Sequence, residues 1–120
     1  MKTAVIRIQR SAATGLRDMA DRFSSAWHSG RGDGALIQFE SPRALFKVLS
    51  PKRWELVERL QALGPISIRG LARDLERDVK RVHDDVLLLI EHGLVTRTDE
   101  RKVQVPYDVI RADFDLRAVA

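Results

Sequence analysis

Basic side chains recur through a short stretch of this 120-residue chain. Between Ser67 and His83 they occupy polar positions: Arg69, Arg73, Arg77, Lys80 and Arg81. Such side chains bind phosphate oxygens, and on a helix they can also reach base edges in the DNA major groove. Three carboxylates in the same stretch reduce the positive field: Asp74, Glu76 and Asp78. The alternative interpretation is therefore the solvated face of an ordinary helical domain.

Two helices are expected to position these cations. Ser67 can cap the first, in which Ile68, Leu71, Ala72 and Leu75 follow at helical spacing. The second helix has one apolar stripe, made of Val79, Val82, Val86, Leu89 and Ile90, and Gly93 ends it in a left-handed conformation. Lys80 and Arg81 lie between the valines of this stripe, so they are expected to point away from the core.

A helix before this pair and a hairpin after it complete the pattern. Pro51 to Leu63 is predicted to be a helix that buries Trp54, Val57, Leu60 and Leu63. Residues 94–98 and 102–105 are rich in β-forming residues and flank a tip, Asp99-Glu100-Arg101. This order is typical of a winged helix-turn-helix, whose second helix enters the major groove with its N-terminal half.

That geometry predicts which residues contact double-stranded DNA. The expected contacts on the two helices and the turn are Arg69, Arg73, Arg77, Lys80, Arg81, His83 and Asp84. The hairpin is expected to contact the DNA backbone through Arg97, Arg101 and Lys102. Asp84 is also expected to form a salt bridge with Lys80 or Arg81.

The two ends of the chain carry further elements. A strand over residues 3–9, an amphipathic helix over 11–28, a glycine-rich turn over 30–34 and a strand over 35–40 precede a short helix over 42–49. Residues 110–116 alternate as another strand, which needs an edge to pair with, either in the same chain or in a second protomer. We therefore expect an α+β protein with an N-terminal strand-helix-strand extension over residues 1–41. Residues 42–120 would form the winged domain with its C-terminal strand, and a homodimer would join through the exchanged termini.

Composition limits the other classes of function. The net charge of +4 and the pI near 10.0 fit a polyanionic partner. The chain has no cysteine, and His28, His83 and His92 lack the spacing of a zinc motif, so neither a metal nor another cofactor is expected. No nucleophile stands at a recognisable spacing from a base, so an enzyme is not expected. We expect a cytoplasmic protein without a membrane contact, because no apolar run reaches the length of a bilayer span.

Several segments also resemble a family of prokaryotic transcriptional regulators, a winged-helix group similar to the MarR regulators. The resemblance is carried by residues 49–53, 67–73, 77–85, 91–95 and 105–108, and it covers roughly residues 36–116. Gly70 stands where such helices commonly have glutamate, which would weaken the first helix slightly. The resemblance implies a repressor or autorepressor.

Members of that family are often encoded beside a small toxin-like protein, so the resemblance also implies a possible antitoxin that binds a toxin and its own operator. Three hypotheses therefore stand: a DNA-binding regulator, such an antitoxin, and a winged-helix protein-interaction module without DNA contact.

Overall fold

The computed structural model describes residues 2–8 and 34–115. The predicted helix over residues 11–28 and most of the predicted turn over 30–34 lie outside these residues. The chain divides into two compact units, one made of residues 1–45 and 108–120, the other of residues 46–107. The protein is α+β, as expected.

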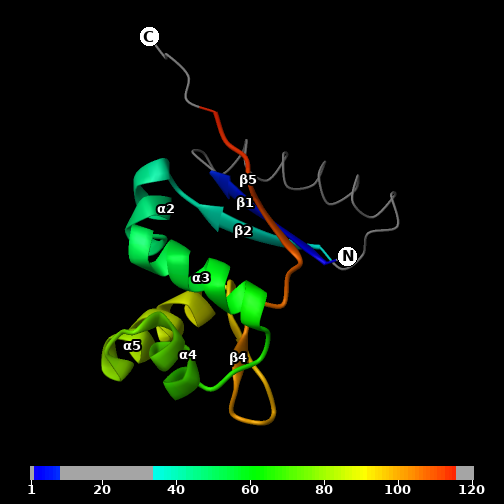
Figure 1. Ribbon diagram of the computed structural model, residues 1–120. Helices are drawn as coiled ribbons and strands as arrows, with labels where there is room; N and C mark the ends of the chain where they lie inside the picture. Colours follow the sequence, from blue (N-terminus) through cyan, green and yellow to red (C-terminus); the bar gives the residue numbers. More distant parts are fainter. Residues whose placement is uncertain (1, 9–33, 116–120) are drawn as a thin grey trace. The chain divides into compact units, whose positions relative to one another are not determined.

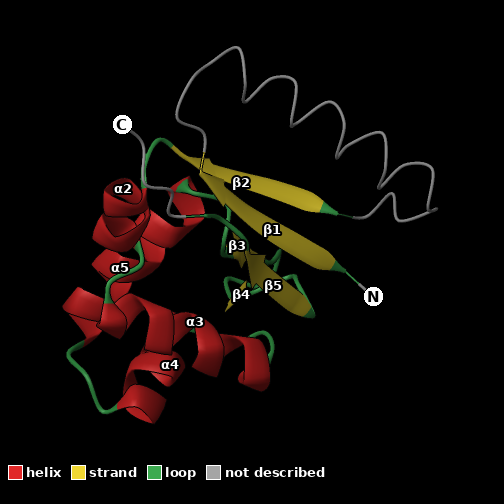
Figure 2. Cartoon of the chain, turned by 90° about the horizontal axis from the view of Figure 1, so that it is seen from above, coloured by secondary structure: helices red, strands yellow, loops and turns green. Residues whose placement is uncertain are grey.

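The first unit is built around a parallel sheet of order β2-β1-β5. Its strands are β1 (Thr3–Ile8), β2 (Ala35–Phe39) and β5 (Val109–Ala112). Figure 2 shows β1 and β2 running side by side, with Ile6 opposite Ile37 in the register. Ala4 and Ile6 of β1 are fully buried, as expected for alternating side chains that place every second residue on the core face.

Strand β5 pairs with β1 of its own chain, with Ala4 opposite Ile110. The predicted exchange of termini between two protomers is therefore not the arrangement in this structure. The two units also differ from the predicted division at residue 42, because the C-terminal strand lies in the same unit as the N-terminal strands. Backbone hydrogen bonds at the start of β5 support the pairing, because the carbonyl of Lys2 accepts from the amides of Asp108 and Val109.

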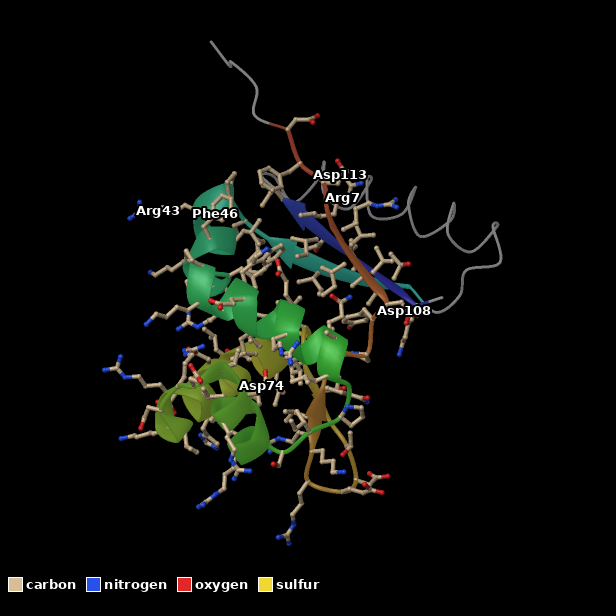
Figure 3. All side chains as sticks on the ribbon, in the orientation of Figure 1. Arg7, Arg43, Phe46, Asp74, Asp108 and Asp113 are labelled. Atoms are coloured by element: carbon tan, nitrogen blue, oxygen red, sulfur yellow. The ribbon has the colours of Figure 1, made fainter. Side chains whose placement is uncertain are left out.

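Side chains also join the two ends of the chain. The Lys2 amide donates to Oδ2 of Asp108 at 2.8 Å, and Arg7 Nη2 forms an ion pair with Oδ2 of Asp113 at 3.1 Å (Figure 3). The strand ends at Ala112, earlier than the predicted Leu116.

The second unit contains three consecutive helices, α3 (Pro51–Leu63), α4 (Ile68–Leu75) and α5 (Val79–Glu91), which are shown in Figure 1. The short helix α2 (Pro42–Val48) leads into it from β2. The three longer helices begin at side-chain caps, which satisfy amides that have no partner within a helix. These caps are Ser50, Ser67 and Asp78. After α5, Gly93 turns the chain with φ +84°, as predicted.

The core of this unit comes from all three helices and the segment after them. Its fully or almost fully buried helical residues are Leu56, Val57, Leu60, Leu71, Ala72, Val82, Val86 and Leu89. Two predicted core residues are exposed, Trp54 by 39% and Val79 by 43%, and Leu63, which was also predicted to be buried, is half-buried. Trp54 lies at the edge of the buried face of α3, because that face is centred on Leu56, Val57 and Leu60, and Val79 lies at the end of its helix.

The predicted hairpin is present but short. Strands β3 (Thr96–Arg97) and β4 (Val103–Gln104) pair antiparallel, and the Thr98 amide donates to the Lys102 carbonyl at 2.8 Å. An antiparallel β-bridge between Ile66 and Val103 joins the hairpin to the segment just before α4. This bridge fixes the hairpin relative to the start of α4, since Ser67 is the cap of that helix.

Candidate nucleic-acid interface

The solvent face of α5 carries residues that were predicted to contact DNA. Lys80, His83 and Asp84 are exposed at positions i, i+3 and i+4, whereas Val82 and Val86 are fully buried. The buried stripe therefore fixes the rotation of the helix, and its opposite face is free for a ligand. The neighbouring Arg81 is exposed as well.

An open groove of about 880 Å³ lies beside the N-terminal part of α5. It is lined by residues from the start of α3, the α4–α5 turn and α5: Ser50, Lys52, Arg53, Arg77, Asp78, Arg81, Asp84 and Asp85. Four of these residues are basic and three are acidic. Lys52 was not predicted as a site residue, because its place in the sequence is far from α5 and only the packing of α3 brings it to the groove.

Asp85 binds two of the arginines that line this groove. Its Oδ1 accepts from Arg53 Nε at 3.0 Å, and its Oδ2 accepts from Arg77 Nη2. Arg53 also donates through Nη1 to the carbonyls of Lys47 and Val48, at 3.2 and 3.3 Å. Arg77, predicted to contact DNA, is thus half-buried and engaged in holding the α4–α5 turn against α5.

Asp85 was not predicted as a site residue, although its spacing in the sequence indicates a buried position. The residue lies three positions after Val82 and four before Leu89, so it falls on the buried side of α5. A carboxylate in such a place needs a partner, because burying a charge without one is costly.

The adjacent Asp84 does not form the predicted salt bridge with Lys80 or Arg81. Within the described part of the chain, its contact with a basic side chain is with His83, whose Nδ1 lies 3.8 Å from Oδ1. Neither Lys80 nor Arg81 has an ion-pair partner among residues 2–8 and 34–115. Both cations can therefore bind an external anion without first breaking an internal pair.

The exposed cations of α4 are Arg69 and Arg73. Asp74, which is labelled in Figure 3, was expected to reduce their field. It is paired with Arg59 of α3 instead. Arg59 donates from Nε and Nη2 to the two carboxylate oxygens at 2.6 and 3.0 Å. This hydrogen bonding lowers the pKa of Asp74 and raises the pKa of Arg59. The helix therefore keeps two basic side chains with little opposition from this carboxylate.

The hairpin carries the last predicted contacts. Arg97 and Arg101 are exposed, and Arg101 occupies the loop with φ +62°. Lys102 is half-buried, and its Nζ lies 3.7 Å from Oε2 of Glu100. Glu100 thus partly neutralises the positive field at the hairpin.

Within residues 2–8 and 34–115, no group of three or more histidine or carboxylate side chains gathers as a metal site. None of the helices that the structure describes combines the length and the apolar character needed to cross a bilayer.

A protein-family model matches part of the chain. The model of the HVO_A0114 family matches residues 48–112, which include α3, α4, α5, the hairpin and β5. No curated protein and no solved structure matches the chain. The family match covers more than half of the 120 residues. The chain therefore belongs to the HVO_A0114 family.

Proposed function

We propose that the protein binds double-stranded DNA in a sequence-specific manner and regulates transcription, as a repressor or autorepressor. The observation that carries the proposal is that Lys80 and Arg81 are exposed, without an ion-pair partner among the described residues, at the start of a helix whose opposite face is buried. In this proposal α3, α4, α5 and the β3–β4 hairpin form a winged helix-turn-helix, similar to MarR-like regulators.

The exposed residues then divide by role. The N-terminal half of α5 lies in the major groove, where Lys80 and His83 face the base edges. Lys52 and Arg81 border the groove beside that helix, so they bind phosphates. Further contacts with the DNA backbone come from four exposed arginines, Arg69, Arg73, Arg97 and Arg101. Arg77 acts as a positioning residue, because Asp85 already holds its guanidinium.

Binding titrations of a Lys80→Ala, Arg81→Ala double variant test the proposal. The probe is a duplex selected from a random library by the wild-type protein, with a scrambled duplex as reference. Each lost phosphate contact flattens the slope of log affinity against log salt by about 0.9. We expect weaker binding and a flatter slope for the double variant. A loss of discrimination between the two duplexes would accompany any lost base contact.

A control of equal charge change is available on α2, where Arg43 and Lys47 are also exposed. The Arg43→Ala, Lys47→Ala variant is expected to bind nearly as tightly as the wild type. Equal losses in both variants would mean that net charge, and not the surface of α5, determines binding. Failure of the wild-type protein to enrich any duplex would overturn the proposal and favour the protein-interaction module.

Two partner predictions accompany this proposal. A homodimer would place two copies of α5 on two half-sites, which adds contact area to a small module. Light scattering on the full-length chain tests it, and a monomer would reject it. The antitoxin role stays a prediction that the neighbouring open reading frame would test.

A further inference from the structure

The first residue of α5 is an apolar side chain that the core does not enclose. Val79 is 43% exposed, whereas Val82, Val86 and Leu89 of the same helix have no exposed surface. Val79 follows the cap Asp78, and the exposed His83 lies one turn further along the same side of the helix, at i+4. An aliphatic group thus stands among the residues that the proposed function places against DNA.

The major groove offers one apolar group to such a side chain. Among unmodified base pairs only thymine presents a methyl group there, at C5, while the other edges present hydrogen-bond donors and acceptors. Valine has no donor or acceptor in its side chain, so it cannot read those other edges. Contact between two apolar groups removes both from water, which favours binding wherever the methyl is present.

We propose that Val79 recognises the C5-methyl group of a thymine and makes the protein specific for thymine at one position of its binding site. This inference rests on the proposed function, because it requires the start of α5 to lie in the major groove. This role of Val79 was not predicted from the sequence, because its apolar spacing placed the residue in the core.

The test replaces each thymine of the selected duplex, one at a time, by deoxyuridine. This change deletes only the methyl group and leaves base pairing and every hydrogen-bonding group in place. We expect one deoxyuridine to weaken wild-type binding by about fourfold, the value for one lost buried methyl group. Val79→Ala should bind the thymine duplex more weakly and should lose the difference between thymine and deoxyuridine at that position.

Leu87 supplies the matched control, because it is an apolar residue on the same helix with 40% exposure, two turns closer to the C-terminus. Leu87→Ala is expected to retain the deoxyuridine effect. The inference is overturned if no thymine substitution weakens binding, if the selected duplex contains no required thymine, or if Val79→Ala retains the full effect. In each case the Lys80→Ala, Arg81→Ala variant still reports on the proposed function. Circular dichroism and urea unfolding of Val79→Ala separate a lost contact from a lost fold.

Discussion

Arg53 at the start of α3 donates from Nε to Oδ1 of Asp85 in α5, across 3.0 Å and 32 positions of sequence. Both side chains are largely withdrawn from solvent, with 26% and 14% of their surfaces exposed. The pair joins the first and third helices of the second unit. It therefore stabilises the position of the helix that carries the proposed interface.

Replacing Asp85 by asparagine is expected to destabilise the fold. The change replaces the carboxylate that pairs with two half-buried arginines, Arg53 and Arg77, by a neutral amide. A hydrogen bond to a charged group contributes about 2 kcal/mol to the free energy of unfolding. We expect the free energy of unfolding in urea to fall by about that amount, reduced by the remaining solvent screening.

The neighbouring Asp84 provides the control. It is exposed, and Asp84→Asn should change the free energy of unfolding by less than about 0.5 kcal/mol. Equal effects of the two substitutions would show that the bonds to Asp85 do not stabilise the unit.

These two aspartates also show how far sequence reasoning reaches. The described helices, the cap at Ser67 and the Gly93 stop were predicted correctly because each depends on residues within one or two turns. The exposed cations of α5 followed from the same local periodicity. The partner of Asp85 could not be predicted, because Arg53 is brought to it only by packing between helices.

The errors have the same origin. The exposure of Trp54 and Val79 depends on which neighbours cover the edge and end of each helix, which local spacing does not specify. The pairing of β5 with β1 joins the two ends of the chain, and an alternating pattern identifies a strand without identifying its partner.

Gly70 gives a prediction that opposes simple helix propensity. Alanine usually stabilises a helix by about 1 kcal/mol relative to glycine. A Cβ atom at Gly70, however, would lie 3.0 Å from Cγ1 of Ile66 and 3.1 Å from the Oγ of the cap Ser67. We expect Gly70→Ala to give no increase in the free energy of unfolding, because the crowding offsets the propensity gain. In an Ile66→Ala background the same substitution should become favourable. A gain of about 1 kcal/mol in the wild-type background would contradict this steric argument.

Tyr107 predicts a loss of stability at alkaline pH. Its hydroxyl donates to the Gly93 carbonyl at 2.9 Å, and burial raises its pKa from the ordinary value of 10.0. Because the folded state holds the proton more tightly than the unfolded state, this contribution is complete below pH 10 and is lost as the pH rises through the raised pKa. Urea unfolding as a function of pH should show the decrease.

Tyr107→Phe is the control for that titration. It removes the hydroxyl, so it should lower the stability at neutral pH by about 1 kcal/mol and abolish this part of the alkaline decrease. Since the chain has one tyrosine, the phenolate absorbance of the wild type reports directly on this residue. A folded-state midpoint at or below the ordinary value would contradict the prediction.

Arg101 and Glu76 share an unusual backbone conformation and differ in their expected effect on DNA binding. Arg101 has φ +62° at the hairpin tip, and Glu76 has φ +55° at the end of α4. Side chains in this region cost about 1 kcal/mol, whereas glycine adopts it freely. Arg101→Gly and Glu76→Gly should therefore each raise the free energy of unfolding, by up to about 1 kcal/mol after the entropy of the unfolded chain is considered.

The Arg101→Gly and Glu76→Gly variants should differ in their affinity for DNA. Arg101→Gly removes a proposed phosphate contact, so binding should weaken on all sequences and the salt slope should flatten by about 0.9. Glu76→Gly removes a negative charge from the α4–α5 turn, so binding should be retained or strengthened. Titrations of both variants against the selected and scrambled duplexes measure these effects. Unchanged affinity of Arg101→Gly would remove the hairpin tip from the interface, and a changed sequence preference would mean that Arg101 reads bases instead of contacting the backbone.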